Sequence, residues 1–441
     1  MAVANNLGHG DWIDRISREI MPFVEYDGYE YRYPANDIRV MPGYRIEELR
    51  EASRKLFAVF CKATMICQHC EDRLLQEMEI PQDMIPFLHS MNALNLPTWL
   101  ARFDFVLNES DEFKMVEINA DTPCAVVESY YANELACRNF GKANPNRGCY
   151  EGLKDWLTYI YWAASPEIDL KASHFSTVRP FVFSCFEDYK EDYGTTLFLM
   201  NAMKAGVGEL VPDEAICFES FYGLGIDEAN QVITSDGRVA KGIYRLHPME
   251  LLIDETSDDG STIGINMMKG YAEGKFMMFN PPESLIMQSK GFQAFLWALA
   301  EREHKSLNAD EVHTIRKYML PTYFEDDCDI GKKKYPDQLW IRKPLWGREG
   351  LDISVVDGSG RIQFQKDNLP EEIIRRESRT SIWQKYATQP MIQANTDEGF
   401  LNGYQTVSCF MLGGVPSAVY ARFSPEAIAG TEAYWLPLGL E

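Results

Sequence analysis

Two short segments with alternating side chains, separated by a turn, constrain this chain most strongly. Residues 101–107 and 114–119 alternate between apolar and polar side chains, and residues 108–112 between them have turn-forming composition. The pattern predicts a β-hairpin. Because successive side chains of a strand point to opposite faces, Arg102 and Asp104 share one face of the first strand, and Glu117 and Asn119 share one face of the second.

The polar faces of this hairpin have two interpretations. If they coincide, Asp104, Glu117 and Asn119 present oxygen ligands of the kind that Mg²⁺ prefers, and Arg102 adds a cation suited to a phosphate. A solvated outer face of an antiparallel hairpin shows the same alternation. The spacing alone leaves both interpretations open.

Composition excludes several classes of function. A net charge of −23 argues against a nucleic-acid partner, since phosphate backbones require clustered cations. There is no basic-then-apolar leader and no apolar run long enough to span a bilayer, so we expect neither secretion nor a membrane role. Ten cysteines without regular spacing suit the reducing cytoplasm. Cys67 and Cys70 lack a second Cys-x-x-Cys pair, which favours buried helix thiols over zinc.

The remaining elements are predicted from apolar periodicity. Helices are expected at residues 46–78, 128–139, 150–164 and 195–205, and a strand at 179–186, which together indicate an α/β layer. From residue 339 onward strands are expected at 339–342, 351–356, 361–365, 381–387, 406–412 and 417–423. Residues 254–264 are expected to form an exposed loop.

A glycine loop with two cations lies between two predicted strands. Gly347 and Gly350 would let backbone amides approach an anion, and Lys343 and Arg348 add charge, although a hairpin with a basic tip has the same composition. The loop fits neither the P-loop nor the dinucleotide pattern. We expect these cations to be exposed and without internal partners, so that the loop is a mobile lid.

Four carboxylates follow the strand predicted at residues 179–186. They are Glu187, Asp188, Glu191 and Asp192. Ligands of open α/β sheets gather beyond the carboxyl ends of strands, so the cluster is a candidate site for an ammonium group. A solvated loop is the alternative.

Together these motifs resemble the synthetase module of glutathionylspermidine synthase and its shorter homologues. The shared motifs are Arg-x-Asp at 102–104, Glu-x-Asn-x-Asp-Thr-Pro at 117–123, Glu-Asp at 191–192, Lys-Pro-x-x-Gly-Arg-x-Gly at 343–350, and a Gly-Gly hairpin ending in Arg422. The resemblance implies an ATP-grasp-like α/β (α+β) fold with an N-terminal pre-ATP-grasp-type region, in which ATP lies between two β-layers.

The resemblance also implies roles for individual residues. Asp104, Glu117 and Asn119 would hold Mg²⁺, as two ions, while Arg102 would face the transferred phosphoryl group and Arg422 would stabilise the transition state. Lys290, Lys343, Gly347, Arg348 and Gly350 would contact the nucleotide phosphates, and Gln384, Lys385, Tyr386 and Ala387 would form the strand that meets adenine. Thr122 would contact the thiol tripeptide, and Glu191 and Asp192 would hold the polyamine.

The predicted activity is an ATP-dependent carboxylate–amine ligase that forms an amide through an acyl phosphate. Its substrates would be a small carboxylate such as glutathione and an amine such as a polyamine, while a phosphotransferase and a non-catalytic homologue remain alternatives. The expected regions are 1–100 (aromatic and helical), 101–290 (metal-binding hairpin and substrate binding) and 291–441 (nucleotide-binding strands). The chain departs from the family at Cys124, where a small hydroxyl residue is common, and is too short for the amidase domain of the bifunctional enzymes.

Overall fold

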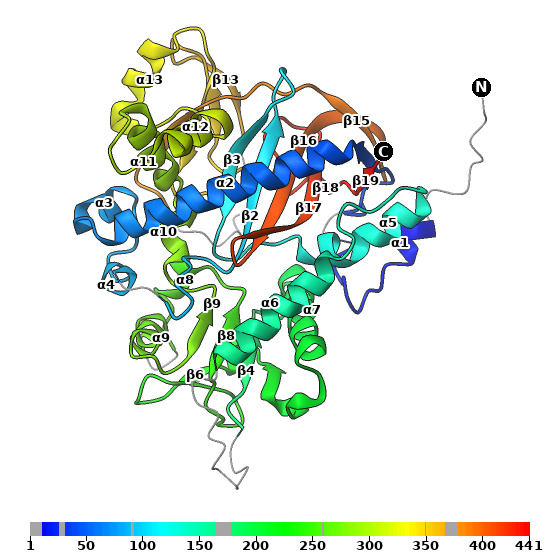
Figure 1. Ribbon diagram of the computed structural model, residues 1–441, viewed down its shortest axis with the longest axis vertical. Helices are drawn as coiled ribbons and strands as arrows, with labels where there is room; N and C mark the ends of the chain where they lie inside the picture. The colour runs from blue at the N-terminus through cyan, green and yellow to red at the C-terminus, as the bar shows by residue number, and fades with distance from the viewer. Residues whose placement is uncertain are drawn as a thin grey trace.

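A central antiparallel sheet combines strands from residues 100–119 with strands from residues 392–435. The computed structural model describes residues 11–25, 31–89, 92–164, 178–257, 260–348, 350–366 and 377–441. The strands of the central sheet lie in the order β18-β17-β16-β2-β3, with β15 paired to β16 (Figure 1). They span Leu100–Leu107 (β2), Phe113–Asn119 (β3), Ile392–Thr396 (β15), Gly399–Leu412 (β16), Val415–Ser424 (β17) and Tyr434–Trp435 (β18).

The predicted hairpin is present. Strands β2 and β3 pair antiparallel, with Arg102 opposite Asn119 and Asp104 opposite Glu117, and a bulge follows at Asp104/Phe105. The four polar side chains therefore share one face of the sheet. The opposite face is covered by α2 (Gly43–Gln68), which runs across the sheet in Figure 1. There the ring of Phe60 packs edge-on against that of Phe103, with 5.4 Å between centroids.

The single helix predicted over residues 46–78 is wrong. Helix α2 ends at Gln68, and a separate helix α3 spans Asp72–Glu77. The ring nitrogen Nδ1 of His69 lies 2.7 Å from the carbonyl oxygen of Met65, so the side chain engages a carbonyl at the end of the helix. Cys67 is buried on α2, and Cys70 lies beyond its end.

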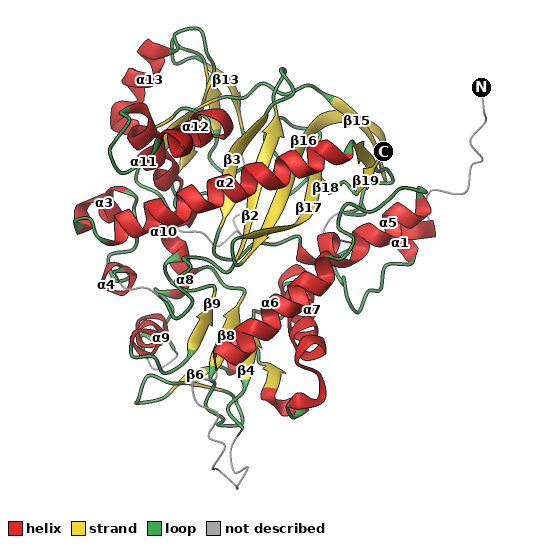
Figure 2. Cartoon of the chain, in the orientation of Figure 1, coloured by secondary structure: helices red, strands yellow, loops and turns green. Residues whose placement is uncertain are grey.

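A parallel sheet forms a second layer, in the order β5-β4-β8-β9. Its strands are Phe181–Ser184 (β4), Ile216–Phe218 (β5), Gly242–Arg245 (β8) and Met277–Phe279 (β9), and both of its faces are buried. Helix α7 (Lys190–Val207) contacts β4, β5 and α6 (Cys149–Ala163), which Figure 2 shows beside this sheet. Because α7 begins at Lys190 and not at residue 195, Glu191 and Asp192 lie in its first turn.

A third sheet, with the order β10-β14-β11-β12-β13, carries the glycine loop. Its strands are Thr322–Phe324 (β10), Trp340–Pro344 (β11), Ser354–Val356 (β12), Ile362–Gln365 (β13) and Ser381–Lys385 (β14). Helices α10 (Ser284–Gln288), α11 (Lys290–Glu301), α12 (Ala309–Tyr318) and α13 (Cys328–Lys334) accompany it. The loop predicted at residues 343–350 connects β11 and β12, which pair antiparallel.

The remaining elements surround these sheets. At the N-terminal side, α1 (Asp11–Asp14) precedes β1 (Arg39–Met41), which pairs in parallel with β19 (Leu438–Leu440), and α4 spans Ile85–Leu88. The helices predicted near 128–139 are a π-helix, η1 (Glu128–Ala132), and α5 (Asn133–Asn139). Helices α8 (Met249–Leu252) and α9 (Ile263–Ala272) and the strand pair β6 (Gly225–Ile226) and β7 (Val232–Ile233) follow. The loop predicted at residues 254–264 contains positions outside the described residues and leads into α9. No described helix is long and apolar enough to cross a bilayer.

Candidate active site

Asp104 lies at the centre of the polar face of the hairpin and is 1% exposed. Arg102 donates to both of its oxygens, from Nε to Oδ1 at 2.7 Å and from Nη2 to Oδ2 at 2.8 Å. Asn119 Nδ2 donates to Oδ2 at 3.1 Å. Burial opposes the charged form of Asp104, but the neighbouring Arg102 lowers its pKa below the ordinary value. Asp104 is therefore a carboxylate in this site.

Glu117 has no hydrogen bond or ion pair with any described residue. Burial lowers the pKa values of Lys290 and Lys343 and opposes the charged form of Arg422, and the charge of Glu117 acts in the opposite direction on all three. Three cations from α11, β11 and β17 therefore converge on one carboxylate. The structure brings these predicted residues together although they lie far apart in the sequence.

The two lysines are buried rather than exposed. Lys343 Nζ donates to Gln384 Oε1 at 2.9 Å and to the carbonyl of Val116 at 3.3 Å. Desolvation lowers the pKa of Lys343 to about 8 and also lowers that of Lys290, the first residue of α11. A bound anion would stabilise the charged form of both side chains.

The prediction that the cations of the glycine loop lack internal partners is wrong. Lys343 contacts Gln384 and Val116, and Arg348 Nη2 forms an ion pair with Glu250 Oε1 at 2.5 Å. Lys290 Nζ, from α11, donates to the loop at the carbonyl of Gly347, at 2.6 Å. Glu250 lies 98 positions away in the sequence, so no local sequence pattern predicts this ion pair. Gly350 has φ +72°, and a Cβ there would lie 2.8 Å from the carbonyl oxygen of Ala429, so both conformation and space require glycine.

The predicted adenine strand is placed as follows. Gln384 is buried and holds Lys343, whereas the side chain of Lys385 lies on the opposite face, 5.5 Å from the ring centroid of Tyr335. The amide of Lys385 donates to Pro321, and that of Tyr386 donates to Leu339. Ala387 directly follows. Tyr386 packs against a small apolar cluster formed by Ile341, Ile353, Val355 and Ile428.

The residues predicted to bind substrate lie where the central and parallel sheets meet. Thr122 follows β3 and is half-buried, two residues before Cys124, whose carbonyl accepts from Arg102 Nη1 at 2.8 Å. Burial, followed by the charges of Glu191 and Asp192, raises the pKa of the Cys124 thiol. The first turn of α7 is therefore close to the end of the metal-candidate hairpin.

A buried ion pair joins the two sheets and was missed by sequence reasoning. Asp121 and Arg245 have fully buried side chains and are 2.5 Å apart. Asp121 also accepts from Ser284 Oγ and from the amide of Met249. Asn280, after β9, bonds to the backbone of Leu100 and Asp121. The signal in the sequence was the place of Asp121 in the Glu-x-Asn-x-Asp-Thr-Pro motif, while its partner Arg245 lies 124 positions away.

The donor set of the hairpin fits a hard cation. Asp104, Glu117 and Asn119 supply two carboxylates and one amide oxygen on one face, and Glu117 is uncommitted to any described residue. Asp104 would have to exchange a bond with Arg102 to bind a metal. Among the described residues, no group of three or more His, Cys, Asp or Glu side chains is placed to hold a metal ion. A metal ion held here would therefore need the carboxamide oxygen of Asn119 in addition to the two carboxylates.

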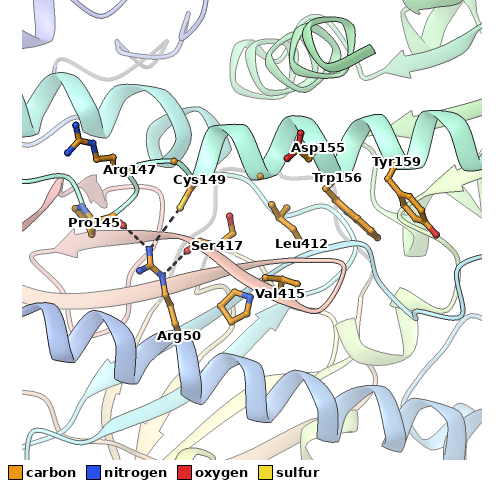
Figure 3. A pocket seen from close by; sticks show the side chains of 13 residues that line it. Arg50, Pro145, Arg147, Cys149, Asp155, Trp156, Tyr159, Leu412, Val415 and Ser417 are labelled. Atoms are coloured by element: carbon orange, nitrogen blue, oxygen red, sulfur yellow. Dashed lines mark hydrogen bonds between the residues drawn. The ribbon is translucent and has the colours of Figure 1, made fainter. Parts of the chain in front are cut away.

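A hollow of about 760 Å³ lies elsewhere in the molecule (Figure 3). It is bounded by α6, α2 and the β16–β17 hairpin, with Arg50, Cys149, Trp156, Tyr159 and Ser417 among its lining residues. Arg50 is engaged with the carbonyls of Pro145 and Ser417. None of the candidate site residues lines this hollow.

Comparison with known proteins assigns this chain to a family. The model of the glutathionylspermidine synthase pre-ATP-grasp family matches residues 7–441. The chain belongs to this family. The prediction made from the sequence motifs is therefore confirmed.

Two individual proteins are also similar. A Haemophilus influenzae protein provisionally named an acid–amine ligase is 22% identical over 347 residues, covering 77% of this chain and 74% of that protein. The structure of a glutathione synthetase-like effector from Globodera pallida, in its apo form, matches with a TM-score of 0.54 at 11% identity, covering 92% of this chain and 90% of that one. With the family assignment, this likeness confirms the predicted mixed α/β, ATP-grasp-like fold.

Proposed function

We propose that the chain is an ATP-dependent carboxylate–amine ligase. The observation that carries the proposal is the charge of the site: four cations, Arg102, Lys290, Lys343 and Arg422, lie around the two carboxylates Asp104 and Glu117. In a chain of net charge −23, this desolvated excess of positive charge is suited to a polyphosphate. The family membership and the name of the Haemophilus influenzae relative support an amide-forming ligase.

The nucleotide would lie between the central sheet and the sheet that carries the glycine loop. Lys290 and Lys343 would contact its phosphates, with Gly347, Arg348 and Gly350 above them. The apolar cluster beside Tyr386 is suited to an adenine ring, with the strand from Gln384 to Ala387 at its edge. Mg²⁺, as two ions, would be held by Asp104, Glu117 and Asn119, and would neutralise phosphate charge.

The chain's own groups would position the reactants and stabilise charge. In the first step a carboxylate oxygen attacks the γ-phosphorus of ATP, the bond to ADP breaks, and an acyl phosphate forms. Arg102 and Arg422 would stabilise the charge on the transferred phosphoryl group. In the second step an amine attacks the acyl carbon and phosphate leaves, which gives the amide. No nucleophilic side chain is required.

The acid and the amine would bind where the central and parallel sheets meet. Thr122 would contact the acid, for which a thiol peptide such as glutathione is the first candidate. Glu191 and Asp192, at the first turn of α7, would bind the ammonium groups of a polyamine. All ten cysteines are free thiols, which suits the reducing cytoplasm, so the reaction would take place there.

The test is a reaction of the purified chain with ATP and Mg²⁺ across acids and amines, beginning with glutathione and spermidine. We expect ADP release that requires both substrates and an amide product of the corresponding mass. Release of ADP with a phosphorylated acid but no amide in the presence of any amine would indicate a phosphotransferase. Absence of ADP release with every pair would contradict the proposal.

A further inference from the structure

Glu128, the first residue of the π-helix η1, is a buried acid with no role in the steps above. Its side chain is fully buried, and its Oε1 accepts from Tyr33 Oη at 3.0 Å. Its other oxygen, Oε2, is also buried and has no hydrogen-bond partner in the part of the chain that the structure describes. A buried carboxylate oxygen without a partner costs stability, which calls for an explanation.

The groups around Glu128 include residues proposed to face the phosphoryl group and residues proposed to bind the amine. After burial, the charge of Glu191 is the largest cause of the raised pKa of Glu128, so Glu191 lies near enough to act on it. The titratable and charged groups that act on it, or on which it acts, are Tyr33 from the N-terminal segment, Arg102 from β2, Cys124 from the loop after β3, Glu191 from α7 and Tyr420 from β17.

A chain of contacts links Glu128 to the residue proposed to face the phosphoryl group. Tyr33 Oη, which donates to Glu128, lies 2.9 Å from Tyr420 Oη. The guanidinium of Arg102 lies 5.7 Å from the centre of the Tyr420 ring. Glu128 is therefore linked through Tyr33 and Tyr420 to Arg102, and the charge of Glu191 acts on it as well.

We propose that Glu128 is the proton acceptor for the amine: its unpartnered oxygen, together with Glu191, receives the alkylammonium group and removes a proton from it. This inference rests on the proposed ligase function. One proton passes from R–NH₃⁺ to the Glu128 carboxylate, and the lone pair of R–NH₂ forms the C–N bond as the C–O bond to phosphate breaks. The phosphate leaves with the electron pair of that bond and takes the second proton from the nitrogen.

The titration of Glu128 is suited to this role. Desolvation, followed by the charge of Glu191, raises its pKa to about 8. A general base is most effective when its pKa lies near the working pH. Since the carboxylate form is populated as the pH rises through this value, amide formation with an alkylamine at saturating ATP should accelerate up to about pH 8 and then level off.

Hydroxylamine provides the discriminating probe, because it is uncharged at neutral pH and needs neither an ammonium site nor a base. The wild-type chain with ATP, Mg²⁺ and glutathione should form both the hydroxamate and, with spermidine, the amide. Glu128→Gln should retain hydroxamate formation but lose about 10²–10⁴-fold in kcat/KM for spermidine, and lose the rise with pH. Glu134→Gln, on the adjoining helix α5 and 40% exposed, is the matched control and should change neither rate.

Three outcomes would overturn the inference. Equal loss of hydroxamate and amide formation in Glu128→Gln would show that Glu128 supports Arg102 or the fold, and unchanged rates of both would show that it has no role. If the wild-type chain forms neither ADP nor hydroxamate with any acid, the proposed ligase function fails, and this inference fails with it. Retained hydroxamate formation in the variant also demonstrates that the variant is folded.

Discussion

Nucleotide binding should weaken above about pH 8 because of Lys343. Its pKa of about 8 in the free protein reflects desolvation, only partly offset by Glu117. A bound triphosphate would raise that pKa, so binding at higher pH must be accompanied by proton uptake. The charged fraction of Lys343 falls from about three-quarters at pH 7.5 to about one-tenth at pH 9, which predicts a Kd about 8-fold higher at pH 9.

The assay is calorimetric titration of the chain with Mg²⁺ and a non-hydrolysable ATP analogue, in buffers of different ionisation enthalpy. About half a proton should be taken up at pH 8, since half of Lys343 is then neutral. Lys290, whose pKa is also lowered, contributes in the same direction. Lys343→Arg keeps its charge at every pH and should lose most of the dependence. An equal pH dependence in wild type and variant, or tighter binding at pH 9, would refute the reasoning.

Three further substitutions test separate parts of the site. Glu117→Gln should reduce ATP turnover at least 100-fold. Its melting temperature should change little, because Glu117 has no described hydrogen bond. A variant that is destabilised but keeps its specific activity would show that the hairpin is merely structural. Glu191→Gln should raise the spermidine KM about 10–150-fold and leave the ATP KM unchanged. Glu187 is exposed and lies outside α7, so Glu187→Gln should leave the spermidine KM unchanged. Identical behaviour of the two variants would argue against the ammonium site. Asp121→Asn should cost about 3–5 kcal/mol of unfolding free energy by chemical denaturation, because Arg245 would remain buried without its counter-ion; a loss below 1 kcal/mol would contradict this.

The hairpin and the face of each of its side chains within a strand could be predicted because a strand repeats every two residues, whereas the cross-strand pairs required the structure. Alternation placed Arg102 with Asp104 on one face of the first strand and Glu117 with Asn119 on one face of the second, and the observed register brings these two faces together. The helix boundary at Gln68 could not be predicted, because apolar periodicity continues past the point where the His69 ring engages the helix end. Local patterns describe repeats well and interruptions poorly.

The ion-pair partners of the charged residues could not be predicted from the sequence, for a different reason. Arg348 meets Glu250, and Arg245 meets Asp121, across 98 and 124 positions. Such contacts depend on how the sheets are joined, which no periodicity encodes. Composition also predicted exposed cations in the glycine loop, whereas Lys343 is only 6% exposed. Long basic side chains can be buried where several strands and a helix supply carbonyl and carboxylate partners.

Arg102 contacts both Asp104 on the hairpin and the loop that carries Cys124, and its replacement gives a final prediction. Its guanidinium donates to both oxygens of Asp104 and to the carbonyl of Cys124, a fork that the single ammonium of lysine cannot reproduce. Each charge-assisted bond lost is worth about 1.5–3 kcal/mol, so Arg102→Lys should lower kcat about 10–150-fold for each contact made to the transferred phosphoryl group. Unlike Glu128→Gln, it should reduce hydroxamate and amide formation by the same factor, since both require acid activation. Arg138→Lys, whose side chain is 73% exposed and pairs with Glu134, is the control. A variant that loses only amide formation would place Arg102 with the amine and not with the phosphoryl group.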